Sequence, residues 1–509
     1  MVESTGRAGC TGRAGPAGAT GPAGSTGKIG FADTAGVNTP ERQARISDVL
    51  DQIKAAGLET LRLSFADQHG VLRGKTLVIS EAESAMHNGC TMTSSLLAKD
   101  TSHKTIFAMW EKGGGLGLTQ MQGAGDFIML PDPATFKVLP WLSKTGWMLC
   151  DIYFCDGSPV PFSTRQILRD ATDELAKRNM QLVCGLEVEF HVFKLDDPKL
   201  SPADAGSIGT PAVAHDVSLL AHGYQYLTEQ RADEIEPVCE MLRQTCVALD
   251  LPLRSMEIEF GPSQFEFTFQ PTDALTAADN MMLFRSAVKQ VCRRNGLHAT
   301  FMSKPQVENT FASGWHLHQS LVDTKSGENL FMPSKTGETL SQTGLHFVGG
   351  LLEHANDAII FACPTVNAYK RFLPYTLAPD RIVWGSDNKG AMLRVISGIN
   401  DPASRIENRV GEPAANPYLY FMSQIWAGLD GIDKKLDPGA PVETPYDCQA
   451  DRLPGNLMVA GKNLKNSRLF RNRLGDQFVD YYLTIKNAEI DRFMQTVTDW
   501  EQREYFEIF

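Results

Sequence analysis

Polar and apolar residues alternate along four segments in the body of the chain. In CGLEVEFHVF, Glu187 and Glu189 are separated by an apolar residue, and the same period runs through MEIEFGPSQFEFTFQ, SGWHLHQSL and SRIENRV. Successive side chains of a β-strand point to opposite faces of a sheet. The period therefore predicts strands that each have one polar and one apolar face.

A helical spacing of apolar residues predicts most of the remaining elements. It is found from about Pro40, near residues 233–250, 273–295, 338–362 and 416–436, and from about Gly475 to the C-terminal region. A capped helix start is expected at Ser163-Thr164, and LRLSFADQHGVLRGKTLVIS contains two β-type runs around a turn at His69-Gly70. The pattern predicts a small β-rich N-terminal domain followed by a large α+β domain.

The N-terminus has a pattern of its own, with glycine at every third position from Gly6 to Gly30. This is a collagen-like period, but nine triplets with only two prolines are too few for a stable triple helix. We therefore expect a flexible tail over residues 1–38 without a catalytic role, an N-terminal domain over 39–155 and a larger domain over 156–509.

Composition narrows the possible functions. The chain has 509 residues, 42% of them hydrophobic, which is enough for a sizeable core. Sixty acidic and 48 basic residues give a net charge of -12, which disfavours binding to nucleic acid or anionic membranes. No apolar run is long enough to span a membrane, and no secretory signal is visible. The ten cysteines form no CxxC pair, so we expect a cytoplasmic protein with free thiols.

The polar strand faces carry the candidate chemistry. Two acidic residues on one strand usually lie on the solvent-exposed face of a sheet. If several such faces line one cavity, their carboxylates would repel one another unless cations were bound. Carboxylates with an occasional imidazole suit Mg²⁺ or Mn²⁺. Two ions beside arginines are typical of phosphoryl transfer, and the absence of a P-loop or kinase motif points to a different ATP-binding scaffold.

The order of motifs over about residues 45–505 resembles the glutamine synthetase superfamily, including its γ-glutamyl amide ligase branches. The motifs are FADQHGVLRGK, LPDPATFKVLPW, CDIYFCDGSPVP, GLEVEF, EFGPSQFE, SGWHLHQSL, PTVNAYKRFLP, APDRIVWGSDNKGAMLR, RIENR and EPAANPYLYFMSQIWAGLDGI. The resemblance implies an α+β fold, with a β-grasp N-terminal domain and a catalytic domain that has a curved antiparallel sheet and surrounding helices. It also implies a homo-oligomer built from rings, expected to be a dodecamer, with sites between subunits.

The resemblance further implies a role for each matching residue. One divalent ion would be held by Glu189, Glu259 and Glu266, and the other by Glu187, His316 and Glu407. His318 and Ser320 would lie by ATP, with Lys389, Arg394 and Arg405 at its phosphates. Arg371 and Arg409 would bind the carboxylate end and the reacting end of the acyl substrate, and Asp100 would reach the nucleophile site of the neighbouring subunit.

The family reaction and four departures from the family pattern define the functional hypothesis. ATP first phosphorylates the γ-carboxylate of glutamate, and ammonia or an amine then displaces phosphate. Here Phe311-Ala312 replaces Asn-Gly, Lys389 replaces arginine, Ser263 replaces the glycine of PGQ, and Leu377 replaces the glutamate that handles ammonium. We expect a ligase joining glutamate to an organic amine, aniline-like compounds being candidates; glutamine synthetase and a non-catalytic sensor remain the alternatives.

Overall fold

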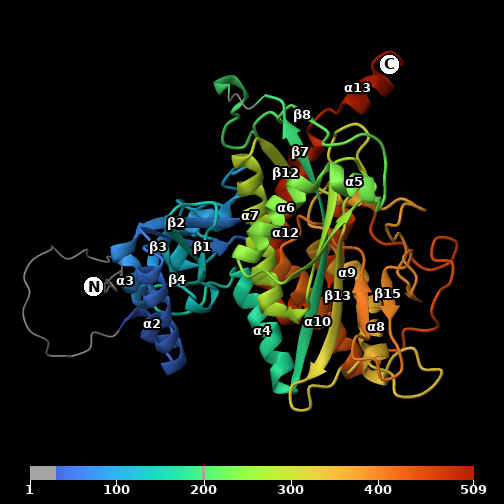
Figure 1. Ribbon diagram of the computed structural model, residues 1–509, viewed down its shortest axis with the longest axis horizontal. Coiled ribbons are helices and arrows are strands. Elements are labelled where there is room, and N and C mark those ends of the chain that lie inside the picture. Colours follow the sequence, from blue (N-terminus) through green and yellow to red (C-terminus); the bar gives the residue numbers. More distant parts are fainter. Residues whose placement is uncertain (1–29, 198–200) are drawn as a thin grey trace, which may run out of the picture. The chain divides into compact units, whose positions relative to one another are not determined.

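The computed structural model describes residues 30–197 and 201–509, so most of the predicted glycine-rich tail lies outside the described residues (Figure 1). The chain forms two compact units. The first comprises residues up to Phe65, Arg73–Ala98 and Phe107–Ser163, and the second comprises Ala66–Leu72, Lys99–Ile106 and Thr164–Phe509. Two short segments of the expected N-terminal domain therefore belong to the second unit.

The first unit is built on a mixed sheet. Its strands are β1 (Thr60–Ala66), β2 (Leu72–Val78), β3 (Cys90–Thr93), β4 (Asp126–Pro131), β5 (Lys137–Val138) and β6 (Thr145–Tyr153), in the order β2-β1-β6-β4-β3 with β5 beside β6. β1 and β6 run parallel. Its helices are α1 (Phe31–Thr34), α2 (Pro40–Ala55) and α3 (Ala82–Asn88), so regular structure begins inside the expected tail.

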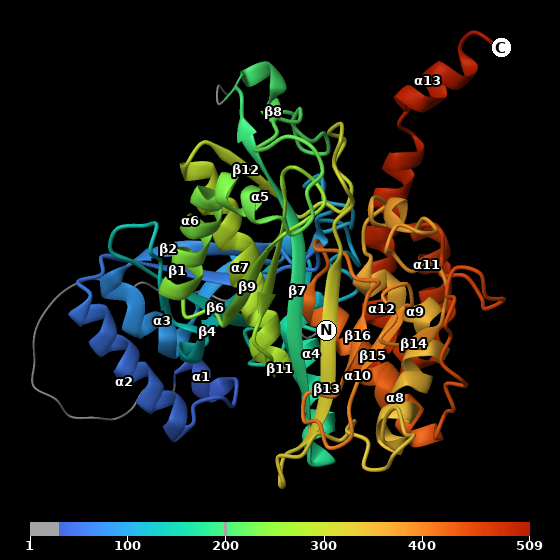
Figure 2. The same ribbon diagram turned by 45° about the vertical axis from the view of Figure 1, so that its right-hand side comes forward.

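The second unit contains a larger sheet in the order β14-β15-β16-β13-β7-β10-β9, with β8, β11 and β12 also paired to β7. The strands are β7 (Met180–Leu195), β8 (Val217–Ser218), β9 (Leu253–Ile258), β10 (Gln264–Phe269), β11 (Thr272–Asp273), β12 (Leu297–Thr300), β13 (Trp315–Asp323), β14 (Trp384–Ser386), β15 (Leu393–Ile396) and β16 (Arg405–Asn408). Figure 2 shows the long strands β7 and β13 side by side. The pairs are antiparallel except for β14 with β15.

Helices surround this sheet, as expected for the α+β class. They are α4 (Thr164–Lys177), α5 (Glu229–Glu234), α6 (Glu236–Ala248), α7 (Ala274–Arg294), α8 (Gln342–Glu353), α9 (Ala355–Ala362), α10 (Pro417–Lys434), α11 (Leu457–Asn466), α12 (Arg468–Met494) and α13 (Asp499–Tyr505). The predicted helical stretches are confirmed, with two differences. α11 was not predicted, and α12 consists of two helices that meet at a kink at Gly475 (φ 79°, ψ 152°), of which only the second, from about Gly475, was predicted.

The apolar faces of β7 and β10 determine which way the acidic faces point. Phe190 of β7 packs on Phe265 and Phe267 of β10, with ring centroids 5.8 and 5.3 Å away, and on Phe284 of α7 at 5.7 Å. All four rings are buried. Because side chains alternate along a strand, burying Phe190 turns Glu189 to the opposite face.

Two further predictions concern the cysteines and membrane-spanning helices. Eight cysteines are free, whereas Cys155 is disulfide-bonded, so the prediction of free thiols holds for those eight and is wrong for Cys155. Among the described residues, no helix has the length and apolar character needed to cross a membrane.

Candidate active site

Acidic side chains from three neighbouring strands share one face of the larger sheet. Glu189 of β7 lies opposite Glu266 of β10, and Glu266 in turn lies opposite Glu257 of β9. Residues that are directly opposite in a sheet point to the same side. Glu259 follows the end of β9 and is also buried. The register thus gathers four carboxyl groups at one place.

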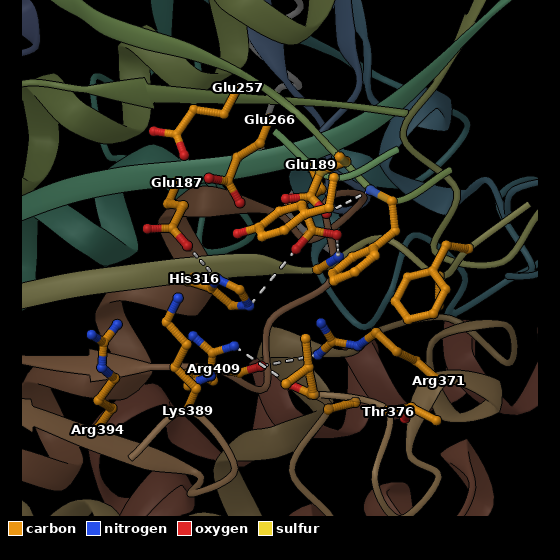
Figure 3. Close-up of a pocket in the computed structure, with 18 residues that line it drawn as sticks. Glu187, Glu189, Glu257, Glu266, His316, Arg371, Thr376, Lys389, Arg394 and Arg409 are labelled. Atoms are coloured by element: carbon orange, nitrogen blue, oxygen red, sulfur yellow. Dashed lines mark hydrogen bonds and ion pairs between the residues drawn. The ribbon is translucent and has the colours of Figure 1, made fainter. Parts of the chain in front are cut away.

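Two histidines of β13 extend this group on the other side of β7. His316 Nδ1 lies 2.6 Å from Glu187 Oε1 (Figure 3). The same nitrogen lies 3.6 Å from Glu407 Oε1, and His318 Nε2 lies 3.0 Å from Glu187 Oε2. Two sets of potential ligand atoms each lie within 4.8 Å of one another: Glu187, Glu266 and His316, and Glu187, His318 and Glu407. Oxygen-rich sets with one imidazole fit Mg²⁺ or Mn²⁺.

Three of the acids are crowded enough to hold protons in the absence of cations. Burial and the neighbouring Glu259 raise the pKa of Glu189 to about 8, and burial raises the pKa of Glu259 to about 7. Burial and the charges of Glu187 and Glu189 raise the pKa of Glu266 to about 11. Divalent cations would compensate this repulsion and allow the carboxylates to ionise.

The pKa values of Glu187 and Glu407 shift in the opposite direction, downward. Burial of Glu187 opposes ionisation, but hydrogen bonds from His316 and His318 outweigh it and lower the pKa of Glu187. Burial also opposes ionisation of Glu407, whose pKa is lowered by the charge of Arg409 and by the two histidines. These two carboxylates therefore remain anionic next to the groups that surround them.

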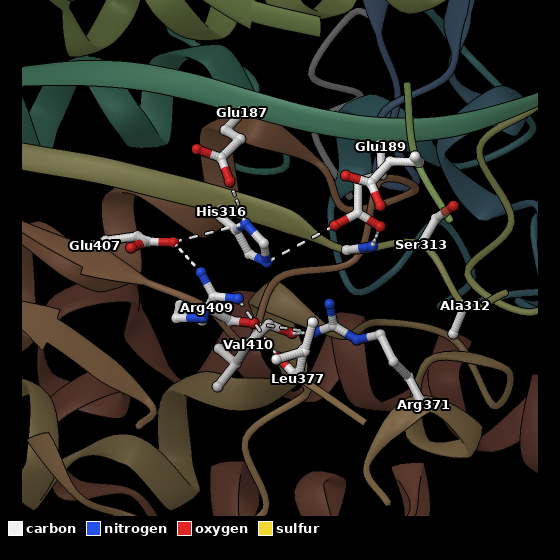
Figure 4. A network of polar contacts seen from close by, with 12 residues as sticks. Glu187, Glu189, Ala312, Ser313, His316, Arg371, Leu377, Glu407, Arg409 and Val410 are labelled. Atoms are coloured by element: carbon white, nitrogen blue, oxygen red, sulfur yellow. Dashed lines mark hydrogen bonds and ion pairs between the residues drawn. The ribbon is translucent and has the colours of Figure 1, made fainter. Parts of the chain in front are cut away.

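Arginines form the opposite side of the site (Figure 4). Arg394 Nη1 lies 3.0 Å from Glu407 Oε2, and Arg409 Nη1 donates to Glu407 Oε1. Arg394 also binds Asp387 at 2.6 Å. Arg409 Nη2 donates to the carbonyl oxygen of Leu377 at 3.5 Å. Glu407, which is fully buried, thus fixes two guanidinium groups facing the acids.

Two backbone carbonyl groups orient the guanidinium of Arg371. Its Nη2 donates to the carbonyl oxygens of Val410 at 2.5 Å and Arg409 at 3.1 Å. Gly314 lies beside it, and a Cβ at that position would overlap Nη1 of Arg371. The N–H of Gly314 also donates to Glu189 Oε2 at 2.9 Å. Gly314 therefore allows a guanidinium and a carboxylate to approach the same backbone position.

A first cavity of about 150 Å³ lies between the acids and the arginines. Its lining includes the predicted residues Glu187, Glu189, Glu259, Glu266, His316, Arg371, Leu377, Lys389, Arg394 and Arg409. Glu407 is near but is completely covered by its partners. The structure thus brings together the predicted metal, phosphate and acyl-substrate residues.

A second cavity of about 690 Å³ adjoins the first. His318, Ser320 and Arg405 line it, and Arg405 Nε donates to His318 Nδ1 at 3.1 Å. Because Nδ1 of His318 accepts this bond, its Nε2 carries the proton that is donated to Glu187. Glu187 and Glu257 line both cavities. A molecule extending from one cavity to the other would therefore pass the acidic cluster.

Asp100 does not line either cavity of its own chain. Its Oδ1 accepts hydrogen bonds from Ser102 N at 2.9 Å, Ser102 Oγ at 2.7 Å and Lys104 N at 3.0 Å. Its Oδ2 lies 3.4 Å from Arg492 Nε. Within one chain, Asp100 stabilises a turn, and its predicted role at a neighbouring site remains a prediction.

Several residues of the first cavity were not predicted. Tyr226, Phe260 and Thr376 line it, as does Glu257. Glu257 shares the alternating pattern of MEIEF, so its position could have been found from the sequence. Tyr226 lies between elements in HGYQYLT, where no period indicates its orientation.

Leu377 lies in an irregular loop at the cavity edge. It has a φ of 60°, in the left-handed region that branched side chains rarely adopt. Its side chain is 45% exposed even though it lines the cavity. Tyr446 Oη donates to the carbonyl oxygen of the next residue, Ala378, at 3.2 Å. Arg409 and Tyr446 thus fix the backbone carbonyl groups of Leu377 and Ala378, and the loop places the apolar side chain of Leu377 at the cavity edge.

Comparison with known proteins relates the chain to one family. Residues 161–505 match the glutamine synthetase catalytic domain. The chain is 44% identical to a γ-glutamylanilide synthase of Acinetobacter sp. over 92% of its length and 97% of that protein. It is 30% identical to a glutamine synthetase of Methanosarcina mazei over 90% of its length and 97% of that protein.

Solved structures agree with the sequence relationship. A GmaS/ADP complex superimposes with a TM-score of 0.74 and 29% identity, covering 90% of this chain and 99% of the other. The chain therefore belongs to the glutamine synthetase family and is an ATP-dependent carbon–nitrogen ligase.

Proposed function

We propose that this protein joins the γ-carboxylate of glutamate to a hydrophobic organic amine, with aniline-like amines preferred. The observation that carries this proposal is Leu377 at the edge of a cavity that retains the family's acids and arginines. The similarity to a γ-glutamylanilide synthase supports the same substrate class. The product would be a γ-glutamyl amide.

The acidic cluster and the second cavity fit the required metal ions and nucleotide. Two Mg²⁺ or Mn²⁺ ions would be held by Glu189, Glu259 and Glu266, and by Glu187, His316 and Glu407. When bound, the ions would neutralise phosphate oxygens during phosphoryl transfer from ATP. His318, Ser320 and Arg405 would contact the nucleotide, with Lys389 and Arg394 at its phosphates, and the ADP-bound relative supports this assignment.

Arginines position the acyl substrate in the first cavity. Arg371 would bind the α-carboxylate, because its guanidinium is oriented by two carbonyl groups and lies beside Gly314. Arg409 would act on the γ-carboxylate, where γ-glutamyl phosphate forms, while Glu407 holds its guanidinium. Fixed donors at a developing charge lower the barrier because they need no reorganisation during the reaction.

The acceptor must attack with a free lone pair. An alkylammonium or ammonium ion has to lose a proton first, and Leu377 cannot accept one. An arylamine is already neutral at pH 7, and its apolar body suits the leucine. Burying an apolar group of this size contributes about 1.5–3 kcal/mol. The chemistry of the residue therefore favours an aromatic amine over ammonia.

The proposal includes a homo-oligomer in which rings of subunits complete the sites, with a dodecamer as the expected size. In that assembly, Asp100 of one subunit would approach the nucleophile site of the next. The turn that fixes Asp100 through Ser102 and Lys104 supports a preformed orientation for its second oxygen.

We expect Leu377→Glu to shift acceptor preference toward ammonia. A carboxylate at this position would bind ammonium and accept its proton, and it would also remove apolar surface from the cavity. The ratio of kcat/KM for aniline to that for ammonia should fall at least ~100-fold, because the lost apolar surface lowers the value for aniline and the new base raises the value for ammonia. Phosphate release would be measured with ATP, Mg²⁺ and glutamate for aniline, isopropylamine, putrescine and ammonia.

Leu373→Glu is the matched control, because Leu373 is exposed four residues away and does not line the first cavity. It should leave the acceptor ratio unchanged. If ammonia is the best acceptor of the unmodified protein, the chain is a glutamine synthetase, as its similarity to the Methanosarcina mazei enzyme would then suggest. If no amine stimulates glutamate-dependent phosphate release, a non-catalytic role is the better conclusion.

Gly314→Ala should impair glutamate binding more than ATP binding. The added Cβ would overlap Arg371 Nη1 and displace the guanidinium. A displacement of about 1 Å at a positioning group costs up to ~100-fold in rate, so we expect at least a ~10-fold rise in the KM for glutamate. Steady-state kinetics with each substrate varied would measure it, and an unchanged KM for glutamate would contradict the assigned role of Arg371.

A further inference from the structure

Three aromatic rings line one part of the first cavity. Tyr226 stacks on Phe260 with centroids 4.3 Å apart and an interplanar angle of 7°, and Phe260 contacts Phe311 at 5.4 Å and 39°. Tyr226 is 41% exposed, and the other two rings are partly exposed. We call these three residues the aromatic wall. Its uncovered ring surface faces the same cavity as Leu377.

The aromatic wall is adjacent to the acids. Phe260 directly follows Glu259, and its N–H lies 3.2 Å from Glu259 Oε2. Tyr226 lines the same cavity as Glu259 and Glu266. A planar molecule lying on the wall would therefore have one edge close to the reacting groups.

One amide connects the wall to the catalytic acids. Gln264 Nε2 donates to Glu189 Oε2 at 3.1 Å, to the carbonyl oxygen of Ala312 at 3.2 Å and to Ser313 Oγ at 3.1 Å. Its Oε1 accepts from Gly261 N at 3.2 Å. The segments that carry Phe260 and Phe311 are thus joined through the same side chain that binds Glu189.

Ser263 connects the third ring to this arrangement. Its Oγ accepts a hydrogen bond from Leu220 N at 2.8 Å, in the segment that leads to Tyr226. Leu227 N, directly after Tyr226, donates to the carbonyl oxygen of Ile258 at 3.1 Å. A glycine at position 263 could not make the hydroxyl contact. Ser263 is therefore a positioning residue for Tyr226.

Three of the four departures from the family pattern, all but Lys389, are connected to this part of the cavity. Phe311 contributes a ring, Ala312 accepts from Gln264, Ser263 anchors the segment of Tyr226, and Leu377 supplies apolar surface. Phe311 and Ala312 replace the Asn-Gly of the family pattern. The geometry links Phe311 to Phe260, and Phe260 to Tyr226, so the three rings form one continuous aromatic surface.

We propose that the aromatic wall is the acceptor subsite and that it binds the ring of a planar aromatic primary amine by stacking. This inference rests on the proposed function. Offset stacking on aligned rings favours a flat aromatic molecule over a saturated ring of the same size. With the ring on the wall, the amino group reaches the γ-acyl group, attacks its carbonyl carbon and releases phosphate, and the proton lost from the amine goes to a base or water.

The test compares ring-removing substitutions across three acceptors. Phe260→Leu and Phe311→Leu would be assayed with ATP, Mg²⁺, glutamate and aniline, cyclohexylamine or hydroxylamine. Hydroxylamine is a small neutral nucleophile that needs no aromatic subsite and reports on acyl activation. We expect kcat/KM for aniline to fall roughly 10-fold or more, with the hydroxylamine value within about 2-fold of the unmodified protein, because only aniline loses stacking and apolar contact.

Matched variants separate recognition from folding. Phe311→Tyr keeps the ring and should keep aniline activity, and Tyr224→Leu changes an exposed aromatic residue outside the cavity and should alter no acceptor. Ser263→Gly should raise the KM for aniline while the kcat for hydroxylamine is unchanged, which a general loss of structure would not produce.

Each negative outcome has a distinct meaning. If the unmodified protein forms no hydroxamate from glutamate and ATP, the proposed function fails. If hydroxamate forms but both leucine variants retain full aniline activity, the aromatic wall is not the acceptor subsite. If both variants instead raise the KM for glutamate and leave the KM for aniline unchanged, the rings serve the acyl substrate and the proposal is overturned.

Discussion

Glu266→Gln should lower turnover by roughly 1,000-fold, since it removes a carboxylate that we assign to a divalent ion at the site of phosphoryl transfer. Glu266 is buried among Glu187, Glu189 and Glu259, and these neighbours with its burial raise its pKa to about 11. Without metal, its side chain is therefore neutral at pH 7, as glutamine is. The variant should fold normally while losing activity, as measured by phosphate release.

Thermal unfolding provides the second readout for Glu266. A ligand that binds only the folded state stabilises it, by about 2.7 kcal/mol at 100 times its Kd. Mn²⁺ should thus raise the Tm of the unmodified protein, and this increase should be smaller in Glu266→Gln, whereas the Tm values without metal should agree. Glu257→Gln is the matched control, because Glu257 lies opposite Glu266 but is in neither ligand set.

Two results would contradict the metal assignment. One is full activity after thorough chelation of divalent ions. The other is an unchanged Mn²⁺-induced increase in Tm for Glu266→Gln, which would show that the ions bind elsewhere.

Arg371→Lys is expected to raise the KM for glutamate roughly 10- to 100-fold and to leave the KM for ATP nearly unchanged. A guanidinium binds a carboxylate through two parallel hydrogen bonds, and hydrogen bonds to charged groups are worth about 1.5–3 kcal/mol each. A lysine ammonium lacks this planar geometry. It would also lose one of the two bonds that Arg371 Nη2 makes to the carbonyl oxygens of Arg409 and Val410.

Initial rates over a range of glutamate and ATP concentrations would measure the Arg371 effect. Lys370→Arg is a suitable control, because Lys370 is adjacent and exposed but does not line the first cavity. If the glutamate dependence of Arg371→Lys is unchanged, Arg371 does not bind the substrate carboxylate, and a different acyl acid has to be considered.

The polar faces could be predicted because alternation along a strand needs no tertiary information. Glu187 and Glu189 on β7 and His316 and His318 on β13 lie as the period indicated. The sequence could not give the register that sets Glu189 opposite Glu266, because register depends on which residues pair across strands.

The aromatic wall could not be predicted for a different reason. Tyr226 lies in an irregular segment, and its orientation depends on contacts with Ser263 through Leu220 and with Ile258 through Leu227. These contacts join positions that are far apart along the chain. Phe311 was visible as a departure from the family pattern, but its stacking partner Phe260 was not.

Glu187 faces both cavities, and this has a thermodynamic consequence for how the two substrates bind. A charge entering either cavity acts on the same carboxylate and on the histidines bound to it. If nucleotide binds in the second cavity and the acyl substrate in the first, as we propose, their binding is linked, and the linkage is reciprocal. If nucleotide makes the acyl substrate bind ten times more tightly, about 1.4 kcal/mol of coupling, the acyl substrate must tighten nucleotide binding by the same factor.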